Sequence, residues 1–200
     1  MADTAIPVRG RPRSVRSHRA ILDAANELLE ERGLVGLTID EVAQRAGVSK
    51  PTIYRRWPTK GTLAFEAFSG DFLARQPLPD TGSLRGDLLA ALRSWIRVVN
   101  RTITGRTLKG LIAEVQRDPE LAEIWRIRFT EPVRAQHRTM LDRAIERGEI
   151  SPRTDPDVVL DLIYGPAYHR LLQSHLPLND RFARGVVDIV IAGVRPDTSD

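Results

Sequence analysis

The residues best suited to chemistry in this chain lie close together between Thr38 and Lys60, and they are suited to binding a polyanion. Lysine and arginine side chains donate to phosphate oxygens, and serine, threonine and tyrosine hydroxyls add neutral donors. A tryptophan among them adds a flat ring with one donor. We therefore expect a nucleic-acid interface formed by Thr38, Ser49, Lys50, Pro51, Thr52, Tyr54, Arg55, Arg56, Trp57 and Lys60.

Two short helices are needed to position these residues, and the sequence contains signals for both. Thr38 can cap a helix, and the apolar residues that follow it recur at the spacing of one helical face. Gly47 falls where a helix commonly ends in the left-handed conformation, and Ser49 with Pro51 suits the start of a second helix. Two helices joined by so short a turn predict a helix-turn-helix, whose second helix can lie in the major groove of DNA.

The string TIDEVAQRAGVSKPTIYRRWPTK at residues 38–60 resembles the DNA-binding segment of the tetracycline-repressor (TetR) family of bacterial transcription regulators. Every fixed position of that family's pattern is filled, T-x-x-x-[IV]-A-x-x-A-G-V-[ST]-x-x-[TS]-[IVL]-Y-x-[HYR]-[FW]-x-x-K. Arg56 takes its variable position before the tryptophan and adds a charge there. The C-terminal half is similar to one of the family's regulatory domains, through LRGDLLAAL, RDPELAEIWR, RAIERGEI and DLIYGPAYHRLL.

The resemblance implies an all-α fold of about nine helices, three for DNA binding and six for ligand binding and dimerisation. It also implies a homodimer joined through the last two helices and a pocket in each regulatory half. The function it implies is that of a ligand-responsive repressor, released from a palindromic operator by an unknown small-molecule effector. A ligand-independent architectural DNA-binding protein and an enzyme are the alternatives.

The first twenty residues hold five arginines against a single acidic residue, Asp3, in a chain whose net charge is +4. The tract Arg9-Gly10-Arg11-Pro12-Arg13 resembles an AT-hook, in which an extended segment lies in a narrow minor groove. We expect a flexible arm whose DNA-contacting residues are Arg9, Arg11 and Arg13. The alternative is a solvated leader without a binding role.

Apolar periodicity and breakers divide the remaining chain into helices and two larger units. The expected division is a basic arm at residues 1–16, a helix-turn-helix domain at 17–60, a connecting helix at 61–75, and a regulatory domain at 83–195. Within the regulatory domain we expect helices at about 84–104, 106–117, 118–147, 156–175 and 179–194. Pro132 should kink the third of these or loosen the turn before it.

Large apolar side chains in the regulatory domain suggest two further sites. Candidate ligand-pocket residues are Trp95, Val99, Ile103, Ile112, Trp125, Phe129 and Tyr164. Ordinary core packing is the alternative for each of them. The last two helices carry more apolar surface than a monomer core needs, which predicts a dimer interface at Leu162, Ile163, Ala167, Leu171, Phe182, Val186, Val187 and Val190. A large core within a monomer is the alternative.

Composition argues against several other classes of protein. The chain has no cysteine, which excludes disulfides and thiolate chemistry, and its four histidines lack metal-ligand spacing. We find no glycine-rich phosphate loop and no G-x-S-x-G motif, so we expect no cofactor, no metal and no catalysis. The absence of a long apolar run and of an apolar signal core leads us to expect a cytoplasmic protein that does not bind membranes.

Overall fold

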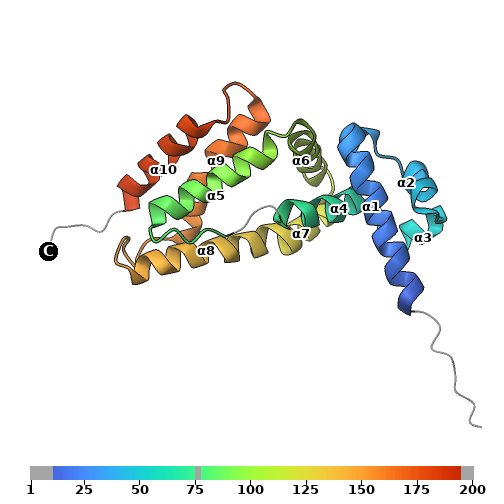
Figure 1. The fold of residues 1–200 in the computed structure, drawn as a ribbon, viewed down its shortest axis with the longest axis horizontal. Coiled ribbons are helices and arrows are strands. Elements are labelled where there is room, and N and C mark those ends of the chain that lie inside the picture. The colour runs from blue at the N-terminus through green and yellow to red at the C-terminus, as the bar shows by residue number, and fades with distance from the viewer. Residues whose placement is uncertain (1–10, 75–77, 195–200) are drawn as a thin grey trace, which may run out of the picture.

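The computed structural model describes residues 11–74 and 78–194, which are helical apart from turns and loops and contain no strand (Figure 1). In chain order the elements are α1 (Arg11–Gly36), α2 (Ile39–Ala46), α3 (Lys50–Tyr54), α4 (Lys60–Ala74), α5 (Leu84–Val99), α6 (Thr102–Val115), α7 (Pro119–Trp125), the π-helical η1 (Arg126–Thr130), α8 (Glu131–Glu146), α9 (Pro156–Gln173) and α10 (Asp180–Val194). With α7, η1 and α8 counted as one continuous helix, the described residues hold nine helices, which confirms the all-α fold. None of the described helices is long and apolar enough to span a bilayer.

The head of the molecule, formed by α1, α2 and α3, lies at one end of Figure 1, and α5, α8, α9 and α10 lie at the other. Capping and ion pairs hold α2 against α1. Thr38 Oγ1 accepts the amide of Glu41 at 3.3 Å, and this is the cap expected from the sequence. Arg32 pairs with Glu41 at 2.6 Å, and Arg45 pairs with Glu31 at 2.7 Å. These contacts fix the direction in which the chain enters the turn before α3.

α1 begins earlier in the chain than the sequence predicts. It begins at Arg11, so Arg13 and the rest of residues 11–16 belong to a helix, and the prediction of an extended arm through residue 16 is wrong for this stretch. A proline in a first helical turn is compatible with this because no amide donor is needed there. At the other end the regular helix is interrupted at Gly33, whose φ of 68° is not helical, and a short helical stretch beyond this kink continues to Gly36.

Two boundaries in the regulatory half also differ from expectation. The first long helix ends at Val99, and α6 already begins at Thr102. The turn before Pro132 is loosened, as predicted, and takes the form of η1, in which the Glu131 amide donates to the Arg126 carbonyl five residues back. A regular α-helix would press the proline ring against the carbonyl four residues earlier, and the wider turn relieves that clash.

Six of the residues expected at the dimer interface are instead buried in the core of this chain. They are Ile163, Ala167, Leu171, Phe182, Val187 and Val190. Of the other two, Leu162 is 51% exposed, and Val186 is partly buried against the same core. The physical reason is that α9 packs against α5, α6, α8 and α10, so its wide apolar face is used within the chain.

We expect replacement of Gly47 by alanine to destabilise the protein. Gly47 ends α2 with a φ of 64°, in a region that costs a residue with a Cβ roughly 1–2 kcal/mol. The free energy of unfolding should therefore fall by about 1 kcal/mol in a denaturant titration at fixed protein concentration.

The matched control is Gly70→Ala, because Gly70 lies within α4 with open space around the position of a Cβ. Alanine there should leave the unfolding free energy unchanged or raise it by up to about 1 kcal/mol. Equal losses at both positions would contradict a special requirement for glycine in the turn.

Candidate nucleic-acid interface and ligand cavity

The outer side of α3 carries most of the residues expected at the nucleic-acid interface. Thr52 is half-buried there, and Ile53 on the opposite side is fully buried in the head. The predicted residues that are exposed on α3 and its flanks are Thr38, Ser49, Lys50, Pro51, Tyr54, Arg55 and Arg56. Arg9 lies outside the described residues. The head thus presents hydroxyl, ammonium and guanidinium donors on one short helix and the turns beside it.

Two of the expected cations already have partners within the chain. Lys50 Nζ lies 2.5 Å from Asp40 Oδ1, and hydrogen bonding to that carboxylate raises the pKa of Lys50. Lys60 Nζ donates to the carbonyl oxygen of Leu34 at 3.2 Å. That carbonyl belongs to the C-terminal turn of α1, where a positive charge is favourable, so Lys60 is accommodated without a bound anion.

Trp57 does not form part of the exposed interface, and its prediction as a surface DNA contact is wrong. Its side chain is 2% exposed, and its indole N–H donates to Glu66 Oε2 at 3.0 Å. His18 stacks on the indole with ring centroids 5.2 Å apart. The ring lies between α1, α3 and α4, so it supports α3 from beneath.

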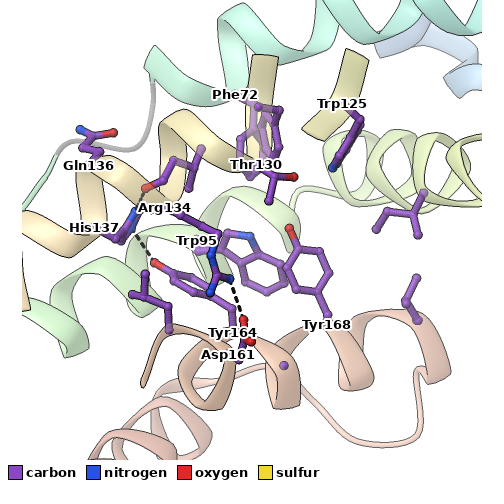
Figure 2. Close-up of a pocket in the computed structure, with 16 residues that line it drawn as sticks. Phe72, Trp95, Trp125, Thr130, Arg134, Gln136, His137, Asp161, Tyr164 and Tyr168 are labelled. Atoms are coloured by element: carbon purple, nitrogen blue, oxygen red, sulfur yellow. Dashed lines mark hydrogen bonds and ion pairs between the residues drawn. The ribbon is translucent and has the colours of Figure 1, made fainter. Parts of the chain in front are cut away.

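A cavity of about 450 Å³ lies in the regulatory half, between α5, α8 and α9 and against η1 (Figure 2). Cavities of this size and apolar character are typical of small-molecule sites. Its aromatic lining consists of Phe72, Trp95, Trp125, Phe129, Tyr164 and Tyr168.

A neutral hydrogen-bonded pair crosses one side of the cavity, as Figure 2 shows. His137 Nδ1 lies 2.7 Å from the carbonyl oxygen of Val133, which can only accept, so the imidazole proton is on Nδ1. His137 Nε2 therefore accepts from the Tyr164 hydroxyl at 2.8 Å. Burial lowers the pKa of His137, raises the pKa of Tyr164, and raises the pKa of Tyr168 to about 12. All three side chains are consequently uncharged near neutral pH.

Ion pairs between α8 and α9 form the charged edge of the cavity. Arg134 lies 2.6 Å from Asp161 and 2.9 Å from Asp157, and Arg138 lies 2.5 Å from the second oxygen of Asp157. The Arg138 and Arg134 guanidinium groups hold the pKa of Asp157 below its ordinary value. Two cations and two anions thus balance at this edge.

The structure brings together some of the predicted pocket residues and separates others. Trp95, Ile112, Trp125, Phe129 and Tyr164 line the same cavity. Val99 lines a separate hollow near the end of α9, and Ile103 lines a small one beside α1 and α4.

Sequence reasoning missed several residues of the cavity wall. Tyr168 follows Tyr164 by one helical turn, a spacing that could have identified it. For Phe72 in the connecting helix and for the polar residues of α8, no local signal points to the cavity. Among the described residues, no cluster of histidine, aspartate or glutamate is placed to hold a metal ion.

Comparison with known proteins identifies both halves of the chain. A model of the bacterial regulatory proteins of the tetR family matches residues 21–67, and a model of the tetracyclin repressor-like C-terminal domain matches residues 78–190. The chain belongs to the tetR family. The helix-turn-helix described above is therefore the DNA-binding domain of a transcription regulator.

Individual members of the tetR family resemble this chain over nearly its full length. The HTH-type transcriptional regulator YdeS of Bacillus subtilis (strain 168) is 40% identical over 187 residues, covering 94% of each chain. The DNA-binding transcriptional repressor TetR of Mycobacteroides abscessus is 32% identical, covering 94% of this chain and 97% of that protein. The crystal structure of the TetR family transcription regulator SCO0332 superposes on this chain with a TM-score of 0.80. The two sequences are 39% identical, and the match covers 90% of this chain and 100% of that chain.

We expect His137 to make stability depend on pH below neutrality. Because burial lowers the pKa of His137 in the folded protein, the unfolded chain takes up a proton at a higher pH than the folded chain does. The stability contributed by neutral His137 is complete above the unfolded pKa of about 6.5 and is lost as the pH falls through the lower folded pKa. Between about pH 7 and about pH 5, the free energy of unfolding should fall more steeply in the wild type than in His137→Gln.

The control for this measurement is His169→Gln, since His169 is exposed on α9. It should retain the wild-type dependence on pH. Indistinguishable slopes for all three proteins would contradict a buried, neutral His137.

Proposed function

We propose that this regulator is a repressor that binds a palindromic operator as a homodimer and is released when a small molecule occupies the cavity. Its proposed location is the cytoplasm, where it has access to the chromosome. The observation that carries the proposal is the arrangement of α3, which presents Lys50, Tyr54 and Arg55 outward while Ile53 anchors it from within. The repressor of M. abscessus, 32% identical, supports repression as the mode of regulation.

In the proposed complex, α3 lies in the major groove. Tyr54 and Arg55 would reach base edges or phosphates, and Thr38 and Ser49 would donate to phosphates on either side. Lys50 would exchange Asp40 for a phosphate, which is favourable because DNA presents many such anions. The arginine-rich N-terminal sequence adds positive charge to the same end of the chain.

Release by a ligand would follow from geometry and linkage. Two recognition helices in a dimer must be separated by about one turn of DNA, roughly 34–36 Å. A ligand that binds preferentially to a form with another separation must weaken DNA binding. The aromatic cavity supplies a place for that ligand, and η1 contributes residues both to the cavity wall and to the region beside the head.

A ligand-independent DNA-binding protein is the second candidate, favoured by the arginine-rich N-terminal sequence. The experiment that separates the two candidates begins with a genome-wide map of bound sites, which defines an operator fragment. Titration of small molecules into the complex of protein and operator then tests release.

The proposed dimer would use the apolar side chains of α9 and α10 that the core of one chain leaves exposed. Val158 and Leu162 lie one turn apart on α9 and are 53% and 51% exposed. Ile189 on α10 is 76% exposed. α9 and α10 pack on each other, so a second copy can cover both helices.

We expect Tyr54→Ala to weaken binding to the operator fragment by about tenfold, because one hydrogen bond to a base or phosphate is removed. The thermal melt should be nearly unchanged, since Tyr54 is half exposed at 50%. Electrophoretic mobility shift and calorimetry measure the two quantities.

The matched control for DNA binding is Arg153→Ala, in the exposed loop between α8 and α9. This variant also removes one exposed side chain but lies in the regulatory half, so operator affinity should be unchanged. A large fall in melting temperature for Tyr54→Ala would instead show that the tyrosine supports the fold.

We expect Ile189→Glu to shift the protein toward monomer in sedimentation velocity, because a carboxylate buried between two copies would lack a partner. Val35→Glu is the control, since Val35 is 92% exposed on the head. Dimers that persist in Ile189→Glu at the wild-type concentration would place the interface on another surface.

A further inference from the structure

The wall of the cavity is formed by aromatic rings that meet one another at steep angles. The centroid of Trp95 lies 5.1 Å from that of Tyr168 at 62°, and Trp125 lies 4.7 Å from Phe129 at 46°. Ring faces and edges are therefore both presented to the space between them. Another aromatic ring gains from such contacts beyond the area that it buries, because offset and edge-to-face arrangements are favourable.

The charged residues at the cavity offer no unpaired charge to a ligand. Arg134 is shared between Asp161 and Asp157, and Asp157 is also paired with Arg138. Asp161 has 69% of its side chain exposed, so the Arg134–Asp161 pair lies at the rim where water screens it. A charged ligand would lose its hydration on entering the aromatic space and gain no free counter-ion, which is unfavourable.

The two tyrosine hydroxyls of the wall differ in whether their protons are available to a ligand. The hydroxyl of Tyr164 already donates to His137, whose other nitrogen is bonded to the backbone. The ring of Tyr168 meets that of Trp95, whose indole N–H can only donate, so this contact leaves the hydroxyl proton of Tyr168 for another acceptor. Figure 2 shows this hydroxyl directed toward the side of the cavity where Thr130 and Trp125 lie.

We propose that the cavity binds an uncharged, planar aromatic molecule that places one hydrogen-bond acceptor, such as a carbonyl oxygen, against the Tyr168 hydroxyl. This inference rests on the proposed function, because it names the ligand class for the same cavity. The rings of Trp95, Trp125 and Phe129 select the flat apolar body, and Tyr168 sets its orientation.

A series of probes built on one ring system tests this proposal. Fluorenone is neutral and carries a carbonyl, fluorene lacks the acceptor, and fluorene carboxylate and fluorenylmethylammonium carry opposite charges. Binding is followed by quenching of tryptophan fluorescence, since Trp95 and Trp125 line the cavity. Fluorenone should bind about threefold to tenfold more tightly than fluorene, the value of one neutral hydrogen bond. Both ions should bind at least about tenfold more weakly than fluorenone.

Two variants connect binding to the cavity and to the hydroxyl. Tyr168→Phe should lower the affinity for fluorenone to that for fluorene and leave fluorene unchanged. Gly165→Leu should weaken all the probes, because Gly165 lines the cavity and has open space at the position of a Cβ. Gly70→Leu, at an equally open glycine on α4 outside the cavity, should bind as the wild type does.

The outcomes separate this inference from the function on which it rests. Tighter binding of either ion, an equal effect of Tyr168→Phe on fluorenone and fluorene, or no binding of any probe would overturn the inference. A leucine at position 165 precedes Pro166, where the backbone is restricted, and this variant can fail to fold. In that case Tyr168→Phe still tests the inference. The proposed function is tested separately by operator release: an ion that binds and releases operator would leave that function standing while refuting the ligand class.

Discussion

The position of α3 depends on one partly buried hydrogen bond, from the indole of Trp57 to the carboxylate of Glu66 at 3.0 Å. Trp57 follows α3 closely in the chain, and Glu66 lies on α4, so the bond joins the recognition helix to the helix that leads into the regulatory half. His18 of α1 stacks on the indole and lies 3.3 Å from the other carboxylate oxygen of Glu66. Because three helices meet at this ring, the exposed donors of α3 are held on a rigid base.

Glu66 is also the point at which the regulatory half comes close to that base. Arg128 of η1 lies 3.7 Å from Glu66, and the next two residues, Phe129 and Thr130, line the cavity. The wide π-helical turn therefore lines the cavity and also approaches Glu66, which supports α3. A ligand that displaced Phe129 would act on the pairing of Arg128 as well, since both belong to one turn of backbone.

Features of the head that depend on local chemistry could be predicted from the sequence, whereas those that depend on packing could not. The cap at Thr38 and the left-handed glycine at residue 47 involve only neighbours in the chain, and both were identified in advance. The prediction for Trp57 is wrong because a tryptophan beside arginines has the same local pattern whether it faces DNA or a carboxylate of the same chain. The carboxylate that decides the matter, Glu66, belongs to the next helix.

The cavity also combines features that the sequence predicts with features that depend on packing between distant helices. Size and apolar character identified Trp95, Trp125, Phe129 and Tyr164 as wall residues, but they also suggested Val99 and Ile103, which face other hollows. Helical spacing defines which residues share a face and leaves open which neighbour that face meets. The polar residues that line the cavity are harder to predict from the sequence than the aromatic ones. Arg134 has the local pattern of a surface arginine, and only the packing of α9 places Asp157 and Asp161 beside it. The pairing that leaves the cavity without a free charge is thus a property of how α8 and α9 pack.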